Sequence, residues 1–189
     1  MNPFNKFNTW FNLAKKSFEF DPTAFALSTS LNNKPDVRMV LLKKVLPDGF
    51  VFFTNIKSNK GKQFIKNNNL AMCFYWESLK KQIRISGKGS IISDKESDLY
   101  FSSRPRKSQL GAWASKQSNE IQSRKILINR FKEYEKKFEK KQVSRPPYWV
   151  GIKIAPTCFE FWQGNQFRLH EREVYNLKQK VWQKKILSP

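Results

Sequence analysis

Short runs of strand-forming residues, separated by strong turn signals, constrain the fold of this chain most. Asn32-Asn33-Lys34-Pro35 and Pro47-Asp48-Gly49 each separate two such runs, and Gly164 with Asn165 separates two later ones. Residues of these types favour tight turns, so the spacing predicts antiparallel hairpins and a meander, not βαβ units. The predicted strands are Ala24–Leu31, Val37–Val45, Phe50–Thr54, Leu70–Trp76, Gln82–Ile92, Trp149–Ile154, Phe159–Gln163, Phe167–Glu173 and Val181–Leu187. So many short strands with few helices predict a mainly β protein, a barrel or a sandwich.

Helices are predicted at the N-terminus and in the middle of the chain. The first, over about 3–18 and ending near Asp21-Pro22, has an apolar stripe at helical spacing formed by Phe4, Phe7, Phe11, Ala14 and Phe18. A short helix is expected over Ser58–Asn67. Ser93 and Glu96 have capping-box spacing for a helix to about Ser102. Further helical stretches are expected at Leu110–Ser115 and Ile121–Phe138, so we treat residues 1–189 as one domain with a helical insertion at about 94–140.

The composition limits which binding partners and which cellular compartment we expect for this protein. Lys and Arg total 36 against 15 Asp and Glu, which gives a net charge of +21. The lysines are scattered among many Asn, Ile and Phe residues that share A- and T-rich codons, so we do not expect nucleic acid to be the main partner. No run of about 18 apolar residues predicts a membrane span. The first residues lack the layout of a secretion signal, so we expect a cytoplasmic protein.

Several common chemistries lack their residues. The chain has no glycine-rich phosphate loop, and Cys73 and Cys158 match no metal or redox spacing. His170 is the only histidine, so we expect no metal site. A Ser-His-Asp triad would have to use His170, whose one nearby acid, Glu171, is predicted on the opposite strand face.

Four basic segments remain as candidate anion-binding surfaces. Arg38–Lys43 has a cation at each end of an apolar strand, on opposite faces if alternation is regular. Phe53–Lys60 is rich in donors and opens a helix, and Ser103–Ser108 combines three cations with two hydroxyls. Arg168–Arg172 would place both arginines and His170 on one face of an extended strand. For any one segment alone, a solvated basic surface is the better interpretation.

Together these segments resemble the pyridoxine (pyridoxamine) 5′-phosphate oxidase family. The matching pieces, in the family's order, are Arg38–Lys43, Ser102–Pro105, Ser108–Trp113, Ser115–Ser118, Glu160–Gly164 and Arg168–Arg172. The resemblance implies an antiparallel, Greek-key-like split β-barrel with flanking helices that binds flavin mononucleotide (FMN) at a homodimer interface. It also implies oxidation of pyridoxamine or pyridoxine 5′-phosphate to pyridoxal 5′-phosphate, with hydride passing to FMN and then oxygen reduced to hydrogen peroxide.

The resemblance also assigns site residues. The flavin contacts it implies are Arg38, Met39, Val40, Leu41, Leu42, Lys43, Phe53, Thr54, Lys60, Gln82, Gln117, Ser118, Trp162 and Arg172. The substrate contacts it implies are Lys43, Tyr100, Arg104, Ser108, Arg168 and His170. Of these, Arg168 and His170 would be the catalytic pair, lying over the pyridine ring, and a proton-accepting role for His170 stays open. Since the cofactor carries the hydride chemistry, no indispensable protein acid or base is expected.

Three positions depart from the family pattern, and other functions stay possible. Asn59 stands where an arginine usually meets the flavin phosphate, so weaker cofactor retention is expected unless Lys57 or Lys62 substitutes. Phe53 replaces a usual tyrosine and Ile186 a usual arginine. The alternatives are another oxidoreductase on the same barrel, a non-catalytic carrier of flavin or pyridoxal phosphate, and a nucleic-acid-binding module.

Overall fold

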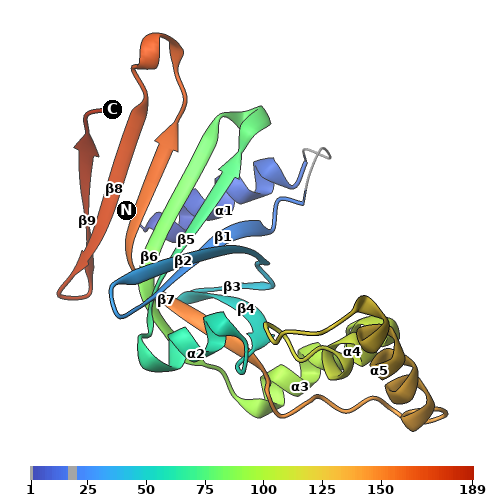
Figure 1. Cartoon of the computed structure of the whole chain (residues 1–189). Helices are drawn as coiled ribbons and strands as arrows, with labels where there is room; N and C mark the ends of the chain where they lie inside the picture. Colours follow the sequence, from blue (N-terminus) through green and yellow to red (C-terminus); the bar gives the residue numbers. More distant parts are fainter. Residues whose placement is uncertain (1, 17–20) are drawn as a thin grey trace.

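The structure, a computed structural model, describes residues 2–16 and 21–189, and within them the strands form one nine-stranded antiparallel sheet. The strand order is β2-β1-β5-β6-β7-β4-β3, and β8 and β9 extend the sheet from β7. The strands are β1 Ala24–Leu31, β2 Lys34–Leu41, β3 Lys44–Leu46, β4 Gly49–Asn55, β5 Asn69–Trp76, β6 Lys81–Ile91, β7 Trp149–Gln163, β8 Glu171–Lys178 and β9 Val181–Leu187. Figure 1 shows α1 beside the sheet and α3 to α5 gathered at one end. The predicted antiparallel β fold with flanking helices is confirmed.

Strand β7 is continuous, whereas the sequence predicted two strands there. One edge pairs with β6, while on the other edge residues 149–154 pair with β4 and residues 158–163 with β8. Pro156 lacks an N–H group, but a register shift beside Ser86 and Gly87 accommodates it as a bulge. A Cβ at Gly87 would stand 2.2 Å from the carbonyl oxygen of Ala155, which only glycine avoids. This change of partner along β7 divides the sheet into two parts.

The predicted strand over Val37–Val45 is interrupted between β2 and β3. The Leu42 amide donates to the carbonyl of Thr23 and the Lys43 amide to that of Val51, each at 2.8 Å. Leu42 is therefore turned into the main core. Under regular alternation Arg38 and Lys43 would lie on opposite faces, but after this break both line one cleft.

The predicted strand over Phe167–Glu173 is wrong in its first half. Gln166–Arg168 is instead a 3-10 turn (η2), with φ of 56° at Phe167 and 63° at Arg168, and β8 begins only at Glu171. The Asn165 amide closes this loop by donating to His170 Nδ1 at 3.1 Å. The Gly164-Asn165 signal thus marks a longer loop than a tight hairpin, and Arg168 does not share a strand face with His170.

The predicted N-terminal helix is present but shorter. Helix α1 spans Pro3–Ala14, and the side chain of Asn2 caps it by accepting from the Phe4 amide at 3.0 Å. Its stripe is buried against the sheet as predicted, through Phe4, Phe7, Phe11 and Ala14. The Phe7 ring packs on those of Phe50 and Phe74, and burying one such ring contributes about 2–3 kcal/mol. The predicted end near Asp21-Pro22 is wrong, because α1 ends at Ala14. The predicted stripe member Phe18 lies outside the described residues.

The other helices place side chains around the cleft. They are α2 Asn59–Lys66, α3 Asp94–Ser102, α4 Arg106–Ala114 and α5 Arg124–Lys137, with a 3-10 turn (η1) at Glu77–Leu79. The predicted capping box of Ser93 and Glu96 opens α3, whereas Ile121 precedes α5 instead of belonging to it. A second, smaller core beneath these helices contains Phe101, Leu110, Phe138, Val143 and Trp149. No helix in the part of the chain that the structure describes is long and apolar enough to cross a membrane.

Candidate functional site

One cleft of about 720 Å³ collects most of the predicted site residues. Its lining comes from β2, β4, the first turn of α2, helices α3 and α4, the segment after α4 and the start of β7. The predicted flavin-contact residues that line it are Arg38, Met39, Val40, Leu41, Lys43, Phe53, Thr54, Lys60, Gln117 and Ser118. The predicted substrate-contact residues that line it are Lys43, Tyr100, Arg104 and Ser108. Segments far apart in the sequence therefore meet around a single space.

One end of the cleft is a donor-rich corner at the start of α2. Lys60 Nζ lies 3.1 Å from Gln117 Oε1, and the Asn59 amide donates to Ser118 Oγ at 3.2 Å. Burial lowers the pKa of Lys60, nearby Arg38 lowers it further, and Asp36 partly offsets both. Two close cations beside a helix N-terminus suit a phosphate, whose negative charge would raise the pKa of Lys60 back towards its ordinary value.

Arg38 is held in this corner by groups that sequence reasoning missed. Its Nη1 donates to the buried Thr29 hydroxyl at 2.6 Å, and its Nη2 donates to Gln63 Oε1 at 3.2 Å and pairs with Asp36. The register Thr29–Asp36 in the β1–β2 hairpin was a usable signal for two of these partners. The contribution of Gln63 from α2 was not readable from sequence spacing.

The other end of the cleft is built around Arg104. Its guanidinium lies 4.8 Å above the Trp149 ring, and its Nη1 is buried with no hydrogen-bond partner in the described residues. Burial lowers the pKa of Arg104, and neighbouring Tyr100 partly offsets this. The rings of Phe53, Tyr100 and Trp149 stack nearly parallel beside it. A half-buried arginine whose spare donor is itself buried favours an anionic ligand with an adjoining flat ring.

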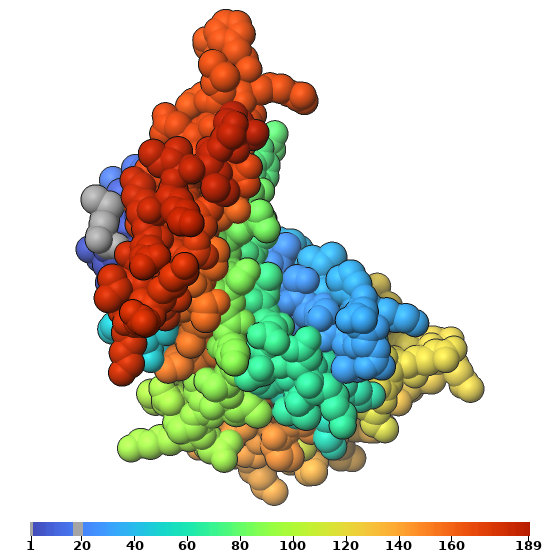
Figure 2. All heavy atoms as spheres, turned by 90° about the vertical axis from the view of Figure 1, so that its left-hand side faces the viewer, coloured from blue at the N-terminus to red at the C-terminus, as the bar shows by residue number. Residues whose placement is uncertain are grey.

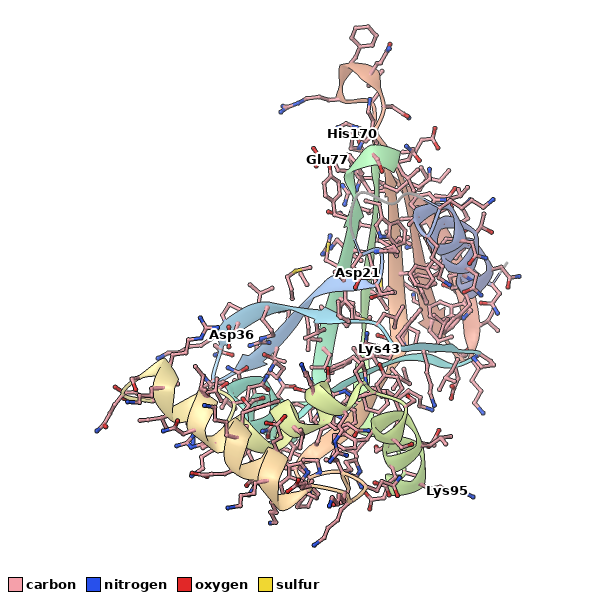
Figure 3. The ribbon with its side chains drawn as sticks, turned by 90° about the vertical axis from the view of Figure 1, so that its right-hand side faces the viewer. Asp21, Asp36, Lys43, Glu77, Lys95 and His170 are labelled. Carbon is pink, nitrogen blue, oxygen red and sulfur yellow. The ribbon has the colours of Figure 1, made fainter. Side chains whose placement is uncertain are left out.

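The remaining predicted residues lie elsewhere in the chain. Gln82, Trp162 and Arg172 are direct cross-strand neighbours on one face of β6, β7 and β8. Figure 3 shows His170 near Glu77 at the far end of the sheet from Lys43 and Asp36. None of Gln82, Trp162, Arg168, His170 and Arg172 lines the cleft within this one chain.

The loop that carries Arg168 and His170 projects from the molecule. Figure 2 shows this segment standing clear of the body, and Phe167 at its tip is 88% exposed. Arg168 is exposed, while the His170 ring packs 4.7 Å from Trp162. Because His170 Nδ1 accepts a hydrogen bond, its neutral ring carries the proton on Nε2 and can donate outward.

Of the three positions that depart from the family pattern, Phe53 lines the cleft and the other two are exposed. Asn59 is exposed in the first turn of α2, and neither Lys57 nor Lys62, the expected substitutes, lines the cleft. Ile186 is 78% exposed on β9. The side chain of Leu42, a predicted flavin contact, lies in the main core.

Comparison with known protein families matches nearly the whole chain. Residues 13–138 match the family model described as pyridoxamine 5′-phosphate oxidase. Residues 149–189 match the model described as the pyridoxine 5′-phosphate oxidase C-terminal dimerisation region.

Individual relatives agree along their full length. The pyridoxine/pyridoxamine 5′-phosphate oxidase of Zymomonas mobilis is 46% identical over 100% of this chain and 98% of its own. That of Pelagibacter ubique is 46% identical over 100% of this chain and 92% of its own. Among solved structures, PhzG from Burkholderia lata, in complex with tetrahydrophenazine-1-carboxylic acid, superposes with a TM-score of 0.94 at 26% identity, covering 100% of this chain and 93% of that one.

A second solved structure supports the fold alone. A pyridoxamine 5′-phosphate oxidase-related, FMN-binding protein from Nostoc punctiforme has a TM-score of 0.79 at 15% identity, covering 100% of this chain and 99% of that one. The predicted split-barrel fold is thereby confirmed. With a family model over two thirds of its length and full-length relatives at 46% identity, the chain belongs to the pyridoxamine 5′-phosphate oxidase family.

Proposed function

We propose that this chain is an FMN-dependent oxidase that converts pyridoxamine or pyridoxine 5′-phosphate to pyridoxal 5′-phosphate. The observation that carries the proposal is the cleft, which has one cationic corner at Lys60 and another at Arg104, with aromatic rings stacked beside Arg104. Two phosphorylated ring compounds, one the cofactor and one the substrate, match this distribution of donors. The curated relatives at 46% identity carry the name of the same activity.

FMN fits the corner at α2. Arg38, Lys60, Gln117 and Ser118 would hold its phosphate by charge and hydrogen bonding, while Met39 to Leu41 of β2 would contact its ring. The bound flavin supplies the redox chemistry, accepting a hydride from the C4′ carbon of the substrate and passing both electrons to oxygen to give hydrogen peroxide. The protein supplies position, and Arg38 is already fixed for this by Thr29, Gln63 and Asp36.

The substrate phosphate fits the corner at Arg104. A phosphate oxygen would satisfy the spare N–H of this side chain, and Lys43, Tyr100 and Ser108 would complete a set of charged and neutral donors. Burial raises the pKa of Tyr100, partly offset by Arg104, so its hydroxyl stays protonated and can donate. Binding of the substrate phosphate here would thereby fix the position of the pyridine ring.

The site is completed, in this proposal, by a second copy of the chain. Val37 and Met39 are largely exposed on β2, on the same sheet face as the Gln82–Trp162–Arg172 row. The C-terminal 149–189 region, which carries Trp162, Arg168, His170 and Arg172, matches a dimerisation region. A homodimer would let this row and the loop of one protomer reach the cleft of the other. Arg168 and His170 would then act on the substrate as the catalytic pair.

Spectroscopy and oxygen uptake test the proposal. Purified protein that has been incubated with FMN and then freed of unbound flavin should show the absorption of bound flavin at about 450 nm. It should also consume oxygen when pyridoxamine 5′-phosphate is added. Pyridoxamine without its phosphate is the control and should be a poor substrate. Oxygen uptake with a tetrahydrophenazine carboxylic acid in place of pyridoxamine 5′-phosphate tests the alternative that the chain is another oxidoreductase on the same barrel. A protein that stays colourless after incubation with FMN would contradict the proposal, and bound flavin without oxygen uptake would indicate a carrier.

A further inference from the structure

A single carboxylate lies behind one of the predicted flavin contacts. Glu160 of β7 is paired across the sheet with Arg84 of β6, two residues along the strands from the Gln82–Trp162–Arg172 row and on the same sheet face. Arg172 Nε and Nη2 both donate to Glu160 Oε1, at 3.0 and 2.8 Å, and Arg84 Nη1 donates to Oε2 at 2.9 Å. The Glu160 side chain is only 12% exposed, so this carboxylate is largely shielded by its two cations.

These contacts leave Arg172 with a defined set of free donors. A guanidinium has five N–H groups, of which two go to Glu160 and one, from Nη1, to the carbonyl of Ser188 at 3.0 Å. Among the residues that the structure describes, one N–H on each terminal nitrogen has no protein partner and is left for a ligand. The bidentate contact with Glu160 fixes the plane of the guanidinium, and with it the direction of those two donors.

We infer that Glu160 is a positioning residue that orients Arg172 for the flavin; this inference rests on the proposed function. The carboxylate does not itself meet the cofactor. It balances the repulsion between Arg84 and Arg172, which lie on the same sheet face, and holds Arg172 beside Trp162. Without it Arg172 would keep only its bond to Ser188, and its long side chain would sample other rotamers.

The chain offers a matched control on the opposite face. Glu173 of β8 also bridges two cations, Lys6 at 2.6 Å and Lys184 at 2.9 Å, with a side chain that is 23% exposed. In the described residues its side-chain carboxylate pairs with Lys6, Lys184 and the Tyr175 hydroxyl, none of which is a predicted flavin contact. Glu160→Gln and Glu173→Gln therefore each remove one bridging carboxylate from the same pair of strands, but only the first lies behind Arg172.

The test measures FMN affinity by quenching of flavin fluorescence in wild type, both single variants, Arg172→Ala and the Arg172→Ala/Glu160→Gln double variant. Thermal unfolding of each confirms that it folds. We expect Glu160→Gln to weaken FMN binding by about tenfold, because a charge-assisted pair becomes a neutral one, and Glu173→Gln to leave it unchanged. In the Arg172→Ala background, Glu160→Gln should add no further loss, because its effect passes through Arg172.

Two results would overturn the inference. One is an equal effect of Glu160→Gln and Glu173→Gln on FMN affinity, which would make Glu160 merely structural. The other is the same loss from Glu160→Gln with and without Arg172. A wild-type protein that binds no FMN would instead refute the proposed function itself, and this inference with it.

Discussion

Replacing Arg104 by methionine should separate ligand binding from stability. Arg104 keeps a buried Nη1 that has no partner in the described part of the chain, and an unsatisfied buried donor costs about 1–3 kcal/mol. The cation–π contact of its guanidinium with the Trp149 ring offsets about 0.5–1 kcal/mol of this cost. Methionine removes the donor and retains an unbranched side chain that packs on the same ring. We therefore expect the free energy of unfolding of the ligand-free variant to equal that of wild type or exceed it by up to about 2 kcal/mol.

The same substitution should severely impair substrate binding. A hydrogen bond to a charged group is worth about 1.5–3 kcal/mol, so the KM for pyridoxamine 5′-phosphate should rise about 10- to 150-fold. Turnover of pyridoxamine without its phosphate should not change. Inorganic phosphate should raise the Tm of wild type more than that of the variant, because only wild type has the buried donor to satisfy.

Arg106 provides the control for this experiment. It stands two residues away, and its guanidinium is paired with the carbonyls of Phe138 and Lys141 at 2.6 and 2.9 Å. Arg106→Met should lower the free energy of unfolding by about 1 kcal/mol and leave KM unchanged. Urea unfolding and steady-state oxygen uptake measure both quantities. The reasoning is refuted if Arg104→Met destabilises the ligand-free protein as Arg106→Met does, or if its KM for the phosphorylated substrate stays at the wild-type value.

Three further predictions concern other parts of the molecule. Burial alone would raise the pKa of Glu173, but hydrogen bonds from Lys6 and Lys184 outweigh this effect and lower the pKa from 4.5 to about 2. The stability advantage of wild type over Glu173→Gln should therefore be complete above pH 4.5 and disappear as the pH falls towards 2. Urea unfolding of both proteins at several pH values measures this difference. Arg168→Ala should lower catalytic efficiency while FMN affinity and Tm stay at wild-type values, with exposed Lys178→Ala as control; unchanged efficiency would exclude contact with the substrate. Asn59→Arg should tighten FMN binding by about fivefold, since it adds a cation beside Lys60. An unchanged Kd for FMN would show that the cations already present in this corner are enough to bind the flavin phosphate.

Local patterns were enough to predict most elements. The Phe4–Ala14 stripe, the Ser93–Glu96 capping box and the hairpin at Asn32-Asn33 depend on interactions within a few residues, and each is confirmed. The errors occurred where a tertiary contact overrides the local signal. Pro156 ends a predicted strand, but the bulge opposite Gly87 carries β7 past it.

The site shows the same limit more sharply. Alternation placed Arg38 and Lys43 on opposite strand faces, and only the break at Leu42, held by Thr23 and Val51, brings them together. The same rule placed Arg168, His170 and Arg172 on one face, whereas the positive φ angles at Phe167 and Arg168 turn that segment into a loop. The motifs that resemble the family supplied the candidate residues, and most of these line one cleft. Their arrangement depends on backbone irregularities that periodicity does not predict.

The division of the site residues into two groups follows from the topology of β7. Its first half pairs with β4 and so belongs to the cleft that holds Lys43 and Arg104, while its second half pairs with β8 and carries Trp162 away from that cleft. Within this one chain, residues 158–163 do not line the cleft that Trp149 lines. Under the proposed function, an active site that uses residues from both halves draws them from two protomers of a homodimer. The proposed function therefore predicts that, in a monomeric variant, FMN contacts only the donors of the first group and neither Arg168 nor His170 reaches the substrate.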